Sequence, residues 1–288
     1  MPELVRRIAE RTLPAGLLQR LRVWKFLRAR DRYPQREVEH RYAGTPLKVV
    51  VGSRYSERYD RDWPQLREIE MLREGRLVPG ATVFDLGASC GVIAMMLASI
   101  VGPSGRVVAL EAHPHDAELA RRNRDLNGLE QLEVVHAAVA REDGELVFGL
   151  NGQVDDGTRR WGDLAVTACS IDGLADRYGA PDVVFIDVDG FEAEALAGAA
   201  RTIAAGPDWF VEIHPVDLAR YGDAGPDQVL AHFDASRYCL YAAADRLVGT
   251  PGLGLQSLTT FAPLAHCPPD LRAQRFFLLA RSVAGLRR

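Results

Sequence analysis

The 288-residue chain predicts an α/β fold in which a mostly parallel sheet carries helices on both faces. Strand-like and helix-like segments alternate through the middle of the chain, which is typical of a parallel sheet with crossover helices. The strand-like segments are almost continuously apolar, as expected for strands buried on both faces. A composition of 47% hydrophobic and 26% charged residues is sufficient for a large core.

The first 40 residues predict a helical extension. Leu17, Leu21 and Trp24 follow the three-to-four spacing of a helix face, with arginines between them. Ten Lys/Arg against five Asp/Glu give this segment a charge of about +5. Four interpretations stay open: a helix packed on the domain, a cap over the site, a dimer contact, or a surface for an acidic partner or membrane. We expect residues 1–45 to form the extension and residues 46–288 a single domain.

The remaining elements follow from local patterns. Residues 60–80 predict a helix because Leu66, Ile69 and Leu72 form an apolar stripe, with Pro79-Gly80 as its stop signal. The polar, glycine-rich segment 144–170 predicts a hairpin and loop near the functional site. Strands are predicted at 47–53, 82–86, 106–111, 132–137, 182–187, 208–213, 237–242 and 275–281, and further helices at 91–101, 115–127 and 191–205.

Charge and cysteine content exclude several classes. A net charge of −4 gives no general attraction to nucleic acid, so none is expected as a partner. Four cysteines without paired spacing indicate reduced thiols in a cytoplasmic protein. No apolar run reaches the roughly 18 residues that a membrane span needs. Oligomeric state is open, with a homodimer as one expectation.

The segment VFDLGASCGVIAMMLA, residues 83–98, predicts a ligand site where a buried strand meets a helix. Gly87 and Gly91 let the backbone approach a ligand, and the helix start offers free N–H groups. Glu111 ends the next strand, twenty residues after Gly91, where an acid hydrogen-bonds a ribose. Asp85 and the missing third glycine disfavour a pyrophosphate. S-adenosylmethionine, with a ribose and positive charges but no phosphate, fits better than a dinucleotide.

Six blocks of the chain occur in the order seen in FkbM-type S-adenosylmethionine-dependent methyltransferases, which the sequence resembles over about residues 47–215. They are VFDLGASCGVIAMMLA, ALEAHPHDAELARRNRDLNG, HAAVAREDGELVF, CSIDGLADRYG, FIDVDGFEAEALAGA and VEIHP. The resemblance implies a Rossmann-like class I methyltransferase fold with a seven-stranded sheet, and usually methylation of a hydroxyl on a sugar or natural product. Two positions depart from the family pattern: Ser89 stands where Asn is common, and Asp189 where Glu is common. The implied cofactor-binding residues are Asp85, Gly87, Ser89, Gly91, Glu111, Ala112, Ala138 and Asp187.

A second group of polar residues follows two neighbouring predicted strands: Asp187, Asp189 and Glu192 after one, Glu212 and His214 at the end of the other. Methyl transfer to a hydroxyl needs a group that handles the hydroxyl proton. We expect Asp187, Asp189 and His214 to be catalytic, although Asp189 as a helix cap and His214 as a packed side chain stay open. Two carboxylates are few ligands, so no metal site is predicted, with Mg²⁺ on Asp187 and Asp189 as the alternative.

The sequence therefore predicts an enzyme that methylates a hydroxyl of a small molecule. A nicotinamide-dependent oxidoreductase and a non-catalytic cofactor-binding interaction module are the alternatives. Two groups of residues are candidates for the substrate mouth: Arg159, Arg160 and Trp161 in the polar insert, and Arg54, Tyr55 and Tyr59 before the cofactor unit.

Overall fold

A computed structural model of the chain describes residues 32–149, 164–221, 224–244, 261–267 and 269–284, together with residues 17, 21, 24, 25 and 28. Leu27 and the candidate mouth residues Arg159, Arg160 and Trp161 lie outside the described residues. Leu17, Leu21 and Trp24 are helical, as predicted, and their side chains are exposed. Within the described ranges, no helix combines the length and apolar character needed to cross a bilayer.

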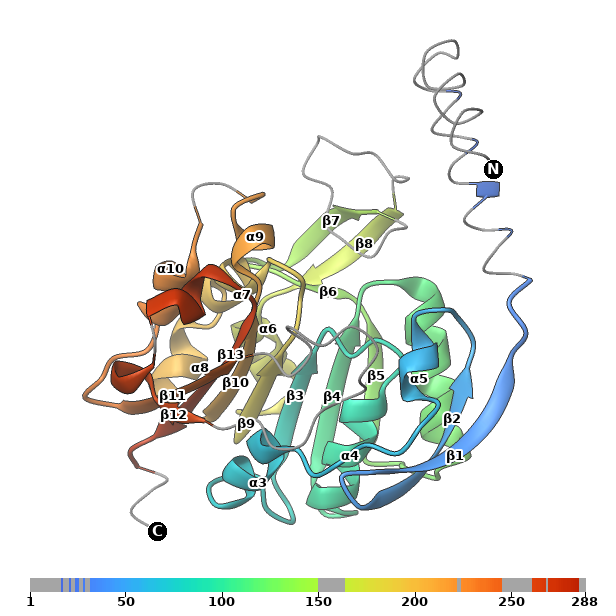
Figure 1. Cartoon of the computed structure of the whole chain (residues 1–288), viewed down its shortest axis with the longest axis horizontal. Coiled ribbons are helices and arrows are strands. Elements are labelled where there is room, and N and C mark those ends of the chain that lie inside the picture. Colours follow the sequence, from blue (N-terminus) through green and yellow to red (C-terminus); the bar gives the residue numbers. More distant parts are fainter. Residues whose placement is uncertain are drawn as a thin grey trace.

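An eight-stranded sheet organises the molecule (Figure 1), in the order β12-β11-β13-β10-β9-β3-β4-β5. Its strands are β3 (Thr82–Leu86), β4 (Arg106–Glu111), β5 (Leu132–His136), β9 (Val183–Ile186), β10 (Asp208–Ile213), β11 (Tyr238–Ala244), β12 (Ala262–Pro263) and β13 (Phe276–Ser282). The neighbours from β5 to β10 run parallel, and β13 is antiparallel to both β10 and β11. The seven predicted strands of the sheet are confirmed, and β12 adds a short eighth strand at the edge.

The chain order reverses at β3. It leaves β3 for β4 and β5 on one side and returns to β9 on the other side of β3. In a doubly wound sheet, the crevice beyond the carboxyl ends of the strands at such a reversal is the usual ligand site. The fold therefore directs attention to the residues that follow β3, β4 and β9.

Alternate residues of each central strand enter two different cores. Val83 and Val107 join the core that packs against α4 and α5, whereas Phe84 and Val108 join the core on the opposite face. Figure 1 shows these two layers of helices on either side of the sheet. On the first face lie α3 (Arg67–Arg73), α4 (Val92–Val101) and α5 (Pro114–Leu126), and on the second α6 (Ile171–Tyr178), α7 (Glu192–Ala197), α8 (Ala200–Ala205), α9 (Pro215–Leu218) and α10 (Pro226–Leu230).

Two smaller sheets flank the main one. β1 (Arg36–Tyr42) and β2 (Thr45–Val51) form an antiparallel hairpin that packs against α5. β6 (Ala138–Val139), β7 (Gly144–Phe148) and β8 (Leu164–Cys169) form a three-stranded sheet, in which β7 and β8 are antiparallel. The predicted hairpin in residues 144–170 is thus confirmed.

Three helix predictions are wrong in extent. Residues 36–40 belong to strand β1, whose partner β2 holds them extended. Of residues 60–80 only Arg67–Arg73 is α-helical, because Trp63 precedes a proline and bonds to the β1 strand, its N–H donating to the carbonyl of Arg41 at 2.8 Å. Residues 191–205 form two helices, α7 and α8, because the chain turns at Gly198, where a Cβ would lie 2.5 Å from the carbonyl oxygen of Ala140.

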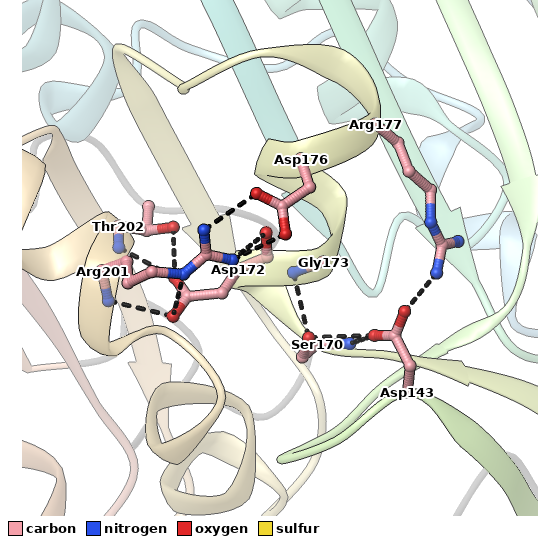
Figure 2. A network of polar contacts seen from close by, with 8 residues as sticks. All are labelled: Asp143, Ser170, Asp172, Gly173, Asp176, Arg177, Arg201 and Thr202. Carbon is pink, nitrogen blue, oxygen red and sulfur yellow. Dashed lines mark hydrogen bonds and ion pairs between the residues drawn. The ribbon is translucent and has the colours of Figure 1, made fainter.

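A polar network ties the loop before β7 to α6 and α8 (Figure 2). The Asp172 carboxylate accepts hydrogen bonds from the backbone N–H groups of Arg201 and Thr202, at 2.9 and 2.8 Å. It thereby caps the first turn of a helix other than its own. Asp143 accepts from the backbone N–H of Ser170 at 2.7 Å and pairs with Arg177. The network fixes the positions of α6 and α8 relative to each other on the second face of the sheet.

Candidate active site

The glycine turn after β3 is shaped by close contacts within the chain. Gly87, Ser89 and Gly91 all have positive φ, at 92°, 51° and 84°. A Cβ on Gly87 would lie 1.9 Å from the carbonyl oxygen of Asp187, and one on Gly91 would lie 3.1 Å from the Cβ of Ala120. The expectation that these glycines clear space for a ligand needs correction: at both positions the space that a Cβ would fill is already taken by the chain itself.

Asp85 is a buried carboxylate on β3, two residues before the turn. Its side chain is buried, and its Oδ2 atom has no hydrogen-bond partner among the described residues. Burial raises the pKa of Asp85 to about 7. A buried acceptor left unpaired costs free energy, and a ligand that donates a hydrogen bond or carries positive charge would recover that cost.

Glu111 ends β4 and links the two strand ends. Its Oε2 accepts a hydrogen bond from the backbone N–H of Ser89 at 2.6 Å, and its Oε1 accepts one from the N–H of His113 at 2.7 Å. Burial raises the pKa of Glu111 to about 7, although these two hydrogen bonds lower it. Because each carboxylate oxygen has two lone pairs, both can still accept from a ribose hydroxyl.

The segment between β5 and β6 lies beside Glu111. The N–H of Ala137 donates to the carbonyl of Glu111 at 3.1 Å, and His136 Nε2 lies 3.0 Å from the carbonyl oxygen of Ala112. Ala138 is buried in β6, and Ala112 packs against the same small core. Glu111, Ala112 and Ala138, all expected to bind the cofactor, are therefore neighbours in space.

A cluster of four carboxylates and one imidazole lies at the ends of β9 and β10. Nε2 of His214 lies 4.0 Å from Asp187 Oδ1, 3.4 Å from Asp189 Oδ1 and 3.5 Å from Glu212 Oε1. Glu192 completes the group from the other side of the ring. We call Asp187, Asp189, Glu192, Glu212 and His214 the acidic cluster. Strand β9 ends at Ile186, and Asp189 has φ 45°, so Asp187 and Asp189 both lie beyond the end of the strand.

Glu192 orients the imidazole of His214. It is fully buried at the start of α7, and its Oε1 lies 2.7 Å from His214 Nδ1 and 2.9 Å from the N–H of Gly190. Burial alone would lower the pKa of His214, but the carboxylates of Glu192 and Glu212 raise it to about 11. The sequence placed Glu192 in the same polar group but did not predict its contact with His214, because that contact depends on how α7 packs beside β10.

The cluster adjoins the glycine turn after β3 through Asp187, and we call this turn the cofactor turn after its predicted ligand. Its N–H donates to the carbonyl of Leu86 at 2.9 Å, and its own carbonyl faces Gly87. Glu212, which the sequence placed in the cluster but not among the catalytic residues, is as close to His214 as Asp189 is, within 0.1 Å. The sequence signal for this closeness is the position of Glu212, two residues before His214. Of the remaining mouth candidates, Arg54 and Tyr55 are exposed, whereas Tyr59 is buried and stacks on Trp63.

Two family profiles match the chain. The Methyltransferase FkbM domain matches residues 85–238, and the Protein-L-isoaspartate(D-aspartate) O-methyltransferase family matches residues 9–148. Among curated proteins, Protein-L-isoaspartate O-methyltransferase 1 of Archaeoglobus fulgidus is 34% identical over 102 residues, which is 35% of this chain and 44% of that protein. A probable cobalt-precorrin-6B C(15)-methyltransferase of Sulfolobus acidocaldarius is 31% identical over 84 residues, 29% of this chain and 42% of that protein. The chain thus spans less than half the length of either relative.

Solved structures give weak similarities. A precorrin-6y C5,15-methyltransferase from Geobacter metallireducens has a TM-score of 0.45 and 15% identity over 76% of this chain and 89% of that one. A methyltransferase FkbM from Methylobacillus flagellatus has a TM-score of 0.40 and 18% identity over 69% and 43% of the two chains. The assignment rests on the FkbM profile, which covers more than half of the 288 residues. The chain belongs to the FkbM family of S-adenosylmethionine-dependent methyltransferases.

Proposed function

We propose that the protein transfers the methyl group of S-adenosylmethionine to a hydroxyl of a small molecule, such as a sugar or a natural-product scaffold. One observation carries the proposal: Asp187 belongs to both halves of the site. Its backbone packs against Gly87 of the cofactor turn, and its carboxylate lies 4.0 Å from Nε2 of His214 in the acidic cluster. Groups suited to a hydroxyl proton therefore stand directly beside the predicted cofactor position.

The residues at the turn fit the cofactor. The unpaired Oδ2 of Asp85 offers an acceptor for a hydrogen-bond donor or positive charge, and Glu111 stands at the end of the next strand for the ribose. When bound, S-adenosylmethionine supplies an electrophilic methyl group on a sulfonium. The proposed binding residues are those expected from the sequence: Asp85, Gly87, Ser89, Gly91, Glu111, Ala112, Ala138 and Asp187.

In this proposal the acidic cluster binds the methyl acceptor and takes up its proton. The cluster would hold the acceptor hydroxyl for attack on the methyl group that S-adenosylmethionine supplies, whose bond to sulfur would break with its electron pair remaining on sulfur. The hydroxyl proton passes to a carboxylate of the group formed by Asp187, Asp189 and His214, which we propose as the catalytic residues. Positioning is the larger contribution of such a site, since an aligned acceptor is worth about 7–11 kcal/mol of barrier in favourable cases.

The charge of the cluster argues against a carboxylate acceptor. Its four acids would repel the carboxyl group that the name of the Archaeoglobus relative implies, since bringing like charges close together is costly. A neutral hydroxyl avoids this repulsion. The family assignment also disfavours the nicotinamide alternative. A cytoplasmic location, a homodimer and the lack of a nucleic-acid partner stay predictions.

Two measurements test the function. Calorimetry with S-adenosylhomocysteine should show saturable binding, which Glu111→Gln should weaken by about 1–3 kcal/mol because a charged acceptor is lost. Methyl-labelled S-adenosylmethionine, incubated with a panel of hydroxylated sugars and polyketides, should then yield labelled ethers. Label found only on proteins, or no binding at millimolar S-adenosylhomocysteine, would sink the proposal.

A further inference from the structure

Three side chains of the acidic cluster form a compact donor set. Asp187, Glu212 and His214 each offer one ligand atom, and the three atoms lie within 4.8 Å of one another. They come from the ends of two hydrogen-bonded parallel strands, β9 and β10, so the backbone keeps the set together. The sequence pointed only to Asp187 and Asp189, two carboxylates without a third ligand.

His214 has the geometry of a metal ligand. Its side chain is 5% exposed, and Nε2 has no hydrogen-bond partner in the described part of the chain, although it points at the carboxylates of Asp187 and Glu212. The other ring nitrogen, Nδ1, is held at 2.7 Å by the buried carboxylate of Glu192. A carboxylate that fixes the far nitrogen of an imidazole is the arrangement that orients histidine ligands in metal sites.

Charge and access also favour a cation. Four carboxylates of the cluster surround one imidazole, while the guanidinium of Arg275 contacts one of them, Glu212, at 3.3 Å. The Asp187 side chain is 49% exposed, so an ion can enter from that side and keep open positions for a further ligand.

We propose that Asp187, Glu212 and His214 bind a divalent first-row transition-metal ion, such as Mn²⁺ or Zn²⁺, and that Glu192 is the positioning residue for His214. The imidazole donor distinguishes this set from the all-oxygen sites of Mg²⁺ and Ca²⁺. Ligands at about 2.0–2.2 Å from a metal lie about 3–4 Å apart. The separations of 3.5 and 4.0 Å from His214 Nε2 to the two carboxylates need only small side-chain rotations.

The ion would lower the pKa of an acceptor hydroxyl next to Asp187, at the face that adjoins the cofactor turn. This role rests on the proposed function. The binding of the ion does not, because it depends only on the three donors.

Metal titration tests the site on the full chain. Protein treated with chelator and dialysed is titrated with MnCl₂ alone, followed by calorimetry and by electron paramagnetic resonance of the ion. Saturable binding of one ion per chain is expected. Asp187→Asn and Glu212→Gln should abolish it, and Glu192→Gln should weaken it about 10–100-fold, as for a group that orients a ligand.

A matched control is Glu194→Gln on the same helix, whose side chain pairs with Arg141 outside the cluster and whose loss should leave Mn²⁺ binding unchanged. Thermal melts show whether each variant is folded. Three results would overturn the metal site: no saturable Mn²⁺ or Zn²⁺ binding, binding unaffected by both Asp187→Asn and Glu212→Gln, or tighter binding of Mg²⁺ than of Mn²⁺. Cofactor and acceptor are absent from these titrations, so metal binding without methylation of hydroxyls would remove only the proposed function. Full turnover in excess chelator would remove only the catalytic role of the ion.

Discussion

Two buried acids, Asp85 and Glu111, set the chemistry of the cofactor turn at the scale of single residues. Both have pKa values raised to about 7, first of all by burial. In the unfolded chain such groups ionise near pH 4. Above that pH, these two buried carboxyls therefore lower the stability of the folded state. We interpret this cost as the consequence of holding acceptors ready for a ligand.

Asp85→Asn should therefore make the protein more stable and the site weaker. A carboxyl whose folded pKa is raised contributes stability that is present below its unfolded pKa and lost as the pH rises through its folded pKa. For Asp85 the loss runs from about pH 4 to pH 7 and amounts to at most about 4 kcal/mol. Urea unfolding at pH 8 should show a gain of a few kcal/mol for Asp85→Asn, and the gain should shrink toward pH 4.

Calorimetry on the same variant should show weaker binding of S-adenosylhomocysteine. Thr82→Ser, at the start of the same strand, serves as a control that changes neither quantity by a comparable amount. A gain in stability that does not vary with pH would mean that the charge of Asp85 is not its source.

The sequence located these acids but not their partners. Asp85 and Glu111 follow from strand ends and spacing, which are local patterns. The hydrogen bond from Ser89 to Glu111 requires the left-handed conformation of Ser89, at φ 51°, and no sequence pattern predicts that conformation for a serine. Asp189, the other departure from the usual family residues, also has a positive φ, at 45°.

At the scale of elements, the main feature is a helix that is capped by a side chain of another helix. Helix α8 is only six residues long, and its N-cap Ala199 offers no side-chain hydrogen bond. Asp172 on α6 supplies the acceptors instead (Figure 2). The stability of α8 thus depends on a neighbouring helix.

Asp172→Ala should lower the free energy of unfolding by about 1–3 kcal/mol, because two backbone N–H groups of α8 and the Thr202 hydroxyl lose their acceptor. Asp176→Ala is the matched control. It removes another carboxylate of α6 that pairs with Arg201, but both partners are exposed, so it should cost about 0–1 kcal/mol. Equal losses in chemical denaturation would show that the cap contributes nothing beyond the ion pair.

Elements defined by local pattern were predictable, and those defined by contact were not. Strands 106–111 and 208–213 have the expected bounds because their apolar runs end at charged or turn residues. The break between α7 and α8 depends on Gly198 packing against Ala140, which is 58 positions earlier in the chain. The acidic cluster was predictable as a group of strand-end residues, whereas the contact of Glu192 with His214 was not.

At the scale of the whole molecule, one sheet carries both the cofactor turn and the acidic cluster. Apart from Ala138 in β6, the proposed cofactor residues lie at or just beyond the carboxyl ends of β3, β4 and β9, and both cores pack on these three strands. A ligand held by all three strand ends should therefore stabilise the domain as one cooperative unit.

Saturation with S-adenosylhomocysteine should raise the midpoint of thermal unfolding in a single transition. A concentration of about 100 times Kd contributes about 2.7 kcal/mol, which corresponds to a shift of about 4–5 °C in a chain of this size. Differential scanning calorimetry gives the measurement, and Glu111→Gln should reduce the shift. Two separate transitions, of which the ligand moves only one, would contradict a common cooperative unit.

The contact between Gly87 and the carbonyl of Asp187 has a consequence for the way this enzyme can diverge. At this contact the glycine turn meets the backbone of Asp187, with the side chain of Val188 close by. A change at the end of β9, where we propose catalysis, therefore also disturbs the turn that we propose as the cofactor site. Changes in the choice of methyl acceptor should therefore arise in the segments around the site, whereas Gly87 and the end of β9 should be conserved together.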